Sequence, residues 1–200
     1  MHKDFTHEMN DVLFRRFFKT WQGARVGKNV PARKAITLRD FAAFAPDLLI
    51  YELHAPDDLR CRLMGSHISD RVKTYSQDIN WLALVADDMQ EAGKTWWCNL
   101  FGTPCAGLMQ FSTGFINGTS RISRALLLPI EHSPGVVHLL TLATASDVYD
   151  VGDPRDKLTI SHDCFQTRYI DVGLGLPEAV PEAQDHKVLN ETYSSRIFID

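Results

Sequence analysis

Three apolar runs in the second half of the chain, joined by two tight turns, restrict the fold more than any other feature of the sequence. The runs cover residues 106–116, 120–131 and 136–145. Asn117-Gly118 separates the first two runs, and Ser133-Pro134-Gly135 separates the last two. Asn-Gly and Pro-Gly between strand-like segments favour hairpins, because glycine adopts the backbone conformations that tight turns require. The sequence therefore predicts three consecutive antiparallel strands.

Another hairpin is predicted earlier in the chain. Residues 48–54 and 59–65 are strand-like, and Pro56-Asp57-Asp58 forms a turn between them. Between this hairpin and the three later strands, residues 66–75 and 81–101 read as mainly helical. The order of helix, two strands, helices and three strands predicts an α+β domain of roughly 100–150 residues.

The N-terminal segment predicts an amphipathic helix over residues 9–21. Apolar residues recur there at three- and four-residue steps, and Arg15, Arg16 and Lys19 form much of the opposite face. A terminal helix this aromatic must bury its apolar face, either on its own sheet or against a second copy of the chain. The candidate dimer-interface residues are Phe14, Phe17, Phe18 and Trp21.

Composition and charge exclude several classes of protein. A chain of 200 residues with 44% hydrophobic residues can bury a core without disulfides. Its 21 basic and 25 acidic residues give a net charge of −4, which argues against a generic nucleic-acid-binding protein. No apolar run reaches the ~18–20 residues that cross a bilayer, and no secretory signal is recognised at the start. We therefore expect a cytoplasmic protein with neither nucleic acid nor membrane as partner.

Motifs for catalysis or metal binding are not found. The four cysteines and eight histidines show no spacing typical of a zinc site. The sequence also has no nucleophile elbow and no kinase or nucleotide-binding fingerprint. We therefore predict a non-catalytic protein without a metal site, and the sequence identifies no cofactor.

A set of short motifs follows in a defined order over about residues 11–146. The motifs are Trp21 in the helix, Pro31 and Arg33, Leu38-Arg39-Asp40, Pro46 with Leu48-Leu49, Arg62-Leu63-Met64-Gly65-Ser66, Gly102-Thr103-Pro104, and Leu127-Leu128-Pro129. Each motif is weak alone, but their order and spacing resemble a bacterial group of PAS-like domains that was long catalogued as uncharacterised.

The resemblance implies a PAS fold, in which helices cover one face of a five-stranded antiparallel sheet. PAS domains are sensory or interaction modules. Many bind a small ligand between sheet and helices, and many form homodimers through an N-terminal helix. The group has no catalytic residues to carry over and no universal cofactor. Because a fold does not establish a function, these points are expectations for this chain.

The chain is expected to divide at about residue 147. Residues 1–147 would form the PAS-like domain with its N-terminal helix, and residues 148–200 a C-terminal extension that packs on the domain or mediates association. Short apolar runs at 158–160 and 196–199 could be added strands. No output module such as a kinase or cyclase is recognised after the PAS-like region, so a signal would leave through another chain.

Candidate ligand-pocket residues come from the central hairpin, the helices after it and one later strand. Ligand sites are mostly apolar with a few polar groups, although the same aromatic residues could simply fill a core. Arg62 could bind an anionic group, or it could face solvent or pair with Glu52 on the neighbouring strand. The candidate residues are Arg62, Met64, Tyr75, Trp81, Trp96, Trp97, Phe101 and Phe111.

Three functions remain open from the sequence. The leading hypothesis is a stand-alone PAS-like sensory or interaction module that signals through an unidentified partner protein, with a small apolar or anionic molecule as candidate ligand. The alternative is a small α+β enzyme or carrier with a cavity for an apolar substrate. A third hypothesis is a structural dimerisation module with a fully packed core.

Overall fold

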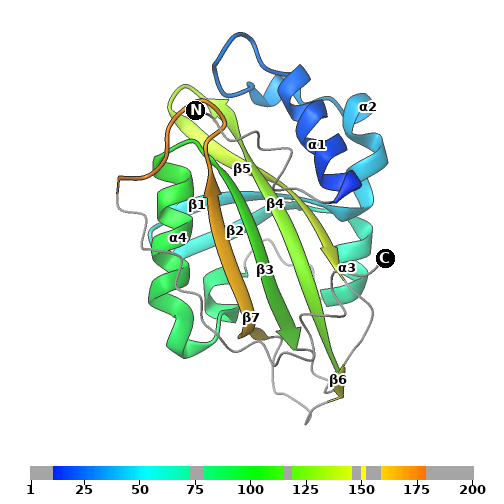
Figure 1. Ribbon diagram of the computed structural model, residues 1–200, viewed down its shortest axis with the longest axis vertical. Helices are drawn as coiled ribbons and strands as arrows, with labels where there is room; N and C mark the ends of the chain where they lie inside the picture. The colour runs from blue at the N-terminus through cyan, green and yellow to red at the C-terminus, as the bar shows by residue number, and fades with distance from the viewer. Residues whose placement is uncertain (1–10, 73–78, 115–118, 146–149, 152–158, 179–200) are drawn as a thin grey trace.

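The structure, a computed structural model, describes residues 11–72, 79–114, 119–145, 150–151 and 159–178 (Figure 1). The α-helices are α1 (Val12–Gly23), α2 (Leu38–Phe41), α3 (Ser66–Val72) and α4 (Gln90–Gly102). The strands are β1 (Leu48–Ala55), β2 (Asp58–Met64), β3 (Ala106–Gly114), β4 (Thr119–Ser133), β5 (Val136–Ala145), β6 (Asp150–Val151) and β7 (Thr159–Ile170). Short 3-10 helices are η2 (Arg33–Ala35), η3 (Ala42–Asp47), η4 (Trp81–Leu84) and η5 (Asp87–Met89).

The strands form one antiparallel sheet in the order β2-β1-β5-β4-β3-β7, and β6 pairs with β4. The predicted hairpin of β1 with β2 and the predicted antiparallel unit of β3, β4 and β5 are present, which confirms the predicted α+β fold. Strand β1 lies between β2 and β5, so the two hairpin units join through a long-range pairing. Strand β7, from the predicted C-terminal extension, pairs with β3 and lengthens the sheet by one strand beyond the five expected.

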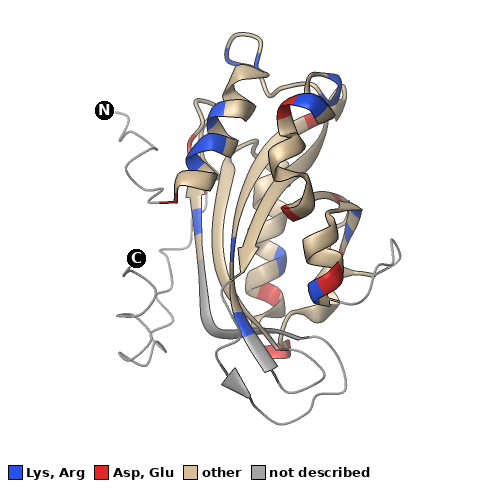
Figure 2. Ribbon diagram, turned by 90° about the vertical axis from the view of Figure 1, so that its right-hand side faces the viewer, with Lys and Arg blue, Asp and Glu red and all other residues tan. Residues whose placement is uncertain are grey.

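Helices cover both faces of the sheet, with α1 and α4 on opposite sides (Figure 2). Strand β4 shows why both faces are buried. Leu126 and Leu128 contribute to the core beneath α1, whereas Leu127, between them, contributes to the core beneath α4. A strand that is buried on both faces reads as a continuous apolar run rather than an alternating one. We call the two cores the α1-side core and the α4-side core.

Helix α1 packs on the sheet of its own chain. Asp11 caps the helix, since its side chain accepts a hydrogen bond from the Leu13 amide at 2.8 Å. The aromatic face meets α2 and η3, where the Phe17 ring lies edge-on to Phe41 and Phe44 with centroids 5.8 and 5.3 Å away. Further members of this α1-side core are Phe14, Phe18, Trp21, Leu48, Ile50, Leu140, Leu142 and Ile170.

The α4-side core holds the remaining helices. Residues 81–101 were predicted to be mainly helical, but η4 and η5 precede α4, which begins only at Gln90. Asn80 caps η4 by accepting a hydrogen bond from the Leu82 amide, and Val85 and Ala86 are extended and end that turn. The buried members of this core include Tyr51, Leu59, Cys61, Ile68, Leu82, Trp96, Trp97, Leu100, Cys105 and Met109.

Gly65 marks the join between β2 and α3. A Cβ atom at this position would overlap the carbonyl oxygens of Ala45 and Pro46. The Gly65 amide also donates to the Leu48 carbonyl at 2.7 Å. Only glycine permits this close backbone approach, which brings α3 against η3 at the edge of the sheet.

Candidate functional site

Aromatic rings form a continuous path through the α4-side core. Tyr51 on β1 contacts Trp81 and Trp97 edge-on, with ring centroids 5.7 and 5.1 Å away. Trp97 contacts Trp96 at 5.1 Å, and Trp96 contacts Tyr169 on β7 at 6.1 Å. The path therefore spans the sheet from β1 to β7 beneath α4.

Two indole N–H groups in this core have no hydrogen-bond partner among the residues that the structure describes. They belong to Trp81 and Trp96, and both nitrogen atoms are buried. Leaving a buried donor unpaired costs roughly 1–3 kcal/mol relative to pairing it. The α1-side core offers the contrast, since the Trp21 indole donates to the Pro129 carbonyl at 2.8 Å. The α4-side core thus holds two donors that an acceptor group would stabilise.

The titratable groups of the α4-side core are held in their neutral forms. Burial, and then the charge of Cys61, raises the pKa of Tyr51 well above its ordinary value. Burial likewise raises the pKa of Cys61 to about 12 and that of Cys105 to about 11. Neither thiol is a thiolate at neutral pH, so neither is an activated nucleophile.

Six of the eight predicted pocket residues gather at this core. Trp96 and Trp97 are buried in it, and the other four pack partly buried against it: Met64, Trp81, Phe101 and Phe111. Tyr75 lies outside the described residues. The structure therefore brings most of the predicted set together, as an aromatic layer between the sheet and α4.

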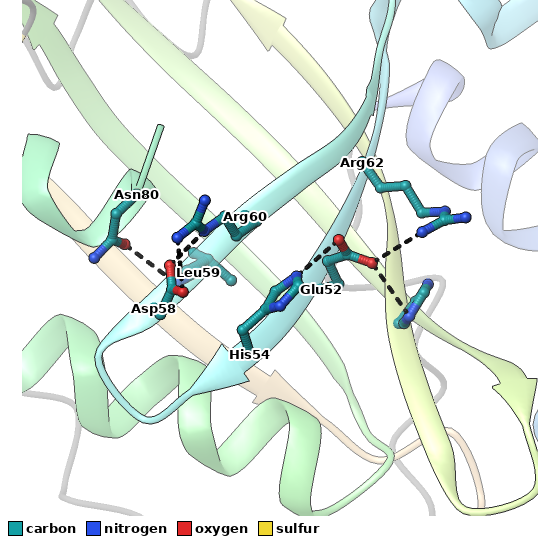
Figure 3. A network of polar contacts seen from close by, with 8 residues as sticks. Glu52, His54, Asp58, Leu59, Arg60, Arg62 and Asn80 are labelled. Atoms are coloured by element: carbon teal, nitrogen blue, oxygen red, sulfur yellow. Dashed lines mark hydrogen bonds and ion pairs between the residues drawn. The ribbon is translucent and has the colours of Figure 1, made fainter. Parts of the chain in front are cut away.

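Arg62 departs from the predicted set, because it lies on the opposite face of the sheet. The pairing of β1 with β2 shifts between Ile50 and Tyr51, and Arg62 is the residue left unpaired at this bulge. Its side chain is 56% exposed and forms an ion pair with Glu52 at 3.4 Å (Figure 3). Glu52 is two residues after Ile50 on β1 and therefore lies on the same face of the sheet as Ile50, which belongs to the α1-side core. Pairing with Glu52, one of the alternatives, is what the structure shows.

Glu52 is the centre of a polar network at this end of the sheet. It accepts a hydrogen bond from His54 at 2.8 Å and lies 3.7 Å from the His138 Nε2 atom (Figure 3). Partial burial would raise the pKa of Glu52, but the hydrogen bond and charge of His54 and the charges of Arg62 and His138 outweigh it, so its pKa is lowered. The carboxylate is therefore held in its charged form.

His138 is the buried member of that network. Its ring stacks on His132 with centroids 4.4 Å apart and 6° between the planes. Its side chain is 6% exposed, and its Nδ1 atom has no hydrogen-bond partner in the described part of the chain. Burial, and then the nearby charge of His132, lowers the pKa of His138 despite the opposing effect of Glu52. The sequence predicted only a structural histidine in an apolar strand and had no signal for this stacked pair, whose members come from two strands.

The four candidate dimer-interface residues lie inside their own chain. Phe14, Phe17 and Trp21 are completely buried, and Phe18 is 5% exposed. This corrects the assignment of these side chains to a dimer interface, since they pack on the chain's own sheet and cannot meet a partner while they do so. Homodimerisation itself stays a prediction and needs another surface.

A surface cavity of about 410 Å³ joins two loops that are distant in sequence. It is lined by Arg25, Gly27, Lys28, Asp171, Val172, Gly173 and Gly175. The polar groups at its wall are largely paired. Asp171 accepts from the Gly173 amide at 2.7 Å and from the Leu174 and Gly175 amides at 3.0 Å. Sequence reasoning missed this cavity, because nothing in the sequence brings residue 25 next to residue 171.

Within the ranges that the structure describes, no three or more His, Cys, Asp or Glu side chains converge in a way that could hold a metal ion. None of the described helices has both the length and the apolarity that a membrane crossing requires.

The strand order, together with helices packed on the sheet, defines an α+β module of the PAS type. The sequence model of the PAS domain family matches residues 9–143, which is more than half of the chain. The chain therefore belongs to the PAS domain family. Neither the curated proteins nor the solved structures yielded a match to the chain. PAS domains are generally non-catalytic modules for sensing or interaction. Membership of the family supports a general sensory or interaction role for this chain.

Proposed function

We propose that this chain is a sensory module that binds a small, uncharged, largely apolar ligand in the α4-side core and signals through a partner protein. The observation that carries the proposal is the pair of indole N–H groups of Trp81 and Trp96, which have no hydrogen-bond partner within the described ranges. Ligand sites are lined mostly by apolar side chains, with a few polar groups that orient the ligand. A ligand with a carbonyl or hydroxyl oxygen would fit this description.

The neutral state of the core supports an uncharged ligand. The pKa values of Tyr51, Cys61 and Cys105 are all raised by burial, which means that charge is disfavoured in this layer. Arg62, the residue expected to bind an anion, lies on the other face. The described members of the α4-side core also include no acid–base pair, which favours a sensory module over the enzyme alternative.

The position of the layer suggests how binding would be transmitted. Trp96 and Trp97 belong to α4, whereas Trp81 belongs to η4 and Tyr51 to β1. A ligand between them would change the distance between α4 and the sheet. Such a change shifts a population only if the ligand binds the two arrangements with different affinity. We propose that a partner chain reads this shift and that the protein acts in the cytoplasm.

Native mass spectrometry of the purified chain tests the ligand proposal. We expect a bound mass that is released on denaturation and is reduced in Trp96→Phe, which keeps an aromatic ring but removes the N–H donor. Trp21→Phe is the matched control, because its indole lies in the α1-side core and donates to Pro129. A wild-type chain without bound mass, or equal loss in both variants, would contradict the proposal.

A further inference from the structure

The charges of the chain are divided very unevenly along the sequence. Residues 12–39 contain eight basic residues and no acidic one. Because the whole chain has a net charge of −4, the remaining residues carry −12. This segment forms α1, the loop after it, η2 and the start of α2, which together cover the α1-side core (Figure 1). We call the outer surface of residues 12–39 the basic cap.

Most cations of the basic cap are available to a partner. Figure 2 shows basic residues on α1 and on the loop beyond it. Five of these side chains are exposed and form no ion pair with any residue that the structure describes: Arg16, Lys19, Lys28, Lys34 and Arg39. Elsewhere the described cations Arg60, Arg62 and Arg71 pair with carboxylates of their own chain. The cap is therefore an unneutralised positive surface.

Aliphatic side chains lie among these cations. Val12 is 61% exposed, and Val26 and Leu38 are each 80% exposed. Val12, Arg16 and Lys19 follow one another at helical spacing and share the outer face of α1. Val26 follows in the loop beyond the C-terminal end of the helix. The cap thus presents positive charge interrupted by apolar contact points.

We infer that the basic cap is a docking surface for an acidic face of a partner protein, one whose carboxylates alternate with apolar side chains. The inference rests on the proposed function, in which the signal passes to another chain. Complementary charge would steer the encounter and set the orientation, while the three aliphatic side chains would supply apolar contact.

Two features favour a protein over an anionic membrane or a nucleic acid. Membrane-surface helices usually present large apolar or aromatic residues to the lipid, but the aromatic residues of α1 are buried in the chain's own core. An extended polyanion would also repel the −12 carried by the rest of the chain, whereas a partner with a local acidic face meets the cap alone. At physiological salt the Debye length is roughly 8 Å, so such a partner interacts mainly with the charges of the cap, and the more distant acidic residues of the chain are screened.

Fluorescence anisotropy with a labelled acidic peptide tests the inference. The probe is (Glu-Glu-Leu-Glu)5, and polyglutamate of equal length serves as the probe without apolar residues. Lys19→Glu and Lys94→Glu each change the net charge by −2, but Lys19 lies on α1 and Lys94 on α4. We expect Lys19→Glu to weaken peptide binding roughly threefold to tenfold, in line with the strength of exposed ion pairs, and Lys94→Glu to change it less than about twofold.

A second pair of substitutions tests the aliphatic contacts. The double variant Val26→Ser and Leu38→Ser keeps the charge of the cap. We expect it to weaken binding of the leucine-containing peptide while leaving polyglutamate binding unchanged. Equal effects on both probes would overturn the apolar part of the inference. Urea midpoints equal to that of the wild type establish that the substituted chains are folded.

Three results would overturn the inference as a whole. The first is equal weakening by Lys19→Glu and Lys94→Glu. The second is Lys19-dependent binding to phosphatidylserine vesicles or duplex DNA that is tighter than binding to the peptide. The third is Lys19-dependent self-association in light scattering, which would assign the cap to a second copy of the chain. The bound mass tested under Proposed function depends on Trp96 and not on Lys19, so failure of one proposal is distinguishable from failure of the other.

Discussion

The two cores of this sheet both contain buried aromatic side chains, but they differ in the pairing of their indole nitrogens. Beneath α1, the Trp21 indole has a carbonyl partner, and the Phe17, Phe41 and Phe44 rings interlock edge to face. Beneath α4, the buried indole nitrogens of Trp81 and Trp96 have no such partner among the described residues. A paired indole favours one arrangement, whereas unpaired donors leave stabilisation to be gained from an added acceptor. The α1-side core is therefore structural, and the α4-side core is the candidate for a ligand.

The largest effect is expected from truncating the α1-side core. Phe17→Ala removes a completely buried ring, and such substitutions cost about 3–5 kcal/mol of unfolding free energy. Urea denaturation measures the loss, and Arg16→Ala on the exposed face of the same helix is the control. A small loss that depends on protein concentration would instead show that α1 is stabilised by a second chain.

A matched pair of tryptophan substitutions compares the cores directly. Trp21→Phe removes a buried hydrogen bond and leaves the Pro129 carbonyl unpaired, so we expect a loss of about 1–3 kcal/mol. Trp96→Phe removes a donor that has no partner in the described structure, so the loss should be clearly smaller in the ligand-free protein. Urea unfolding of protein freed of any bound ligand measures both losses of unfolding free energy. Equal losses would remove the distinction drawn between the two cores.

The stacked histidines predict a smaller effect that depends on pH. Because the pKa of His138 in the folded chain is lowered below 6.5, the unfolded chain binds more protons as the pH falls through that value. Stability should therefore fall between about pH 6.5 and the lower folded pKa of His138, by less than the Trp21→Phe loss. In His138→Gln this part of the decline should disappear, whereas His54→Gln should retain it. NMR titration of the His138 ring measures the pKa directly.

Glu52 contributes in a separate, more acidic window. Its folded pKa is lowered, so its stabilising effect is present above its ordinary pKa of 4.5 and is lost as the pH falls through the folded value. Glu52→Gln should therefore flatten the stability profile below pH 4.5. It should also extend the His138 decline to lower pH, because it removes the charge that opposes the lowered pKa of His138. A profile altered only near pH 6.5 would contradict the assignment of the two windows.

Arg62 should show the smallest effect. Its ion pair with Glu52 is largely exposed, and such pairs contribute less than about 1 kcal/mol. Arg62→Ala should also leave the mass bound in the α4-side core unchanged, because the side chain lies on the other face of the sheet. Loss of the bound mass in this variant would show that Arg62 contributes to ligand binding, and it would contradict the assignment of the ligand to the α4 side of the sheet alone.

Much of the fold could be predicted because the relevant signals are local. The Pro56-Asp57-Asp58 turn separates β1 from β2, and Ser133-Pro134-Gly135 separates β4 from β5, so turn chemistry alone places four strands. The aromatic candidates of the α4-side core could also be predicted from a local signal, since Trp96 and Trp97 are neighbours in a segment predicted to be helical. Strict alternation places Arg62 and Met64 on one face of β2, but the bulge shifts the alternation after Cys61, so Met64 packs on the α4-side core and Arg62 does not.

The sequence by itself determined which segments become strands and helices, that the chain has the PAS motifs in order, and that positive charge concentrates in residues 12–39. Periodicity, turns and composition depend on residues that are close in sequence, so they can be recognised without knowledge of the fold. Only the tertiary structure decided that β1 joins β5, that β7 extends the sheet, and that the aromatic face of α1 is buried in its own chain. It also decided which buried donors found partners, because hydrogen bonds such as that from Trp21 to Pro129 join residues more than a hundred positions apart.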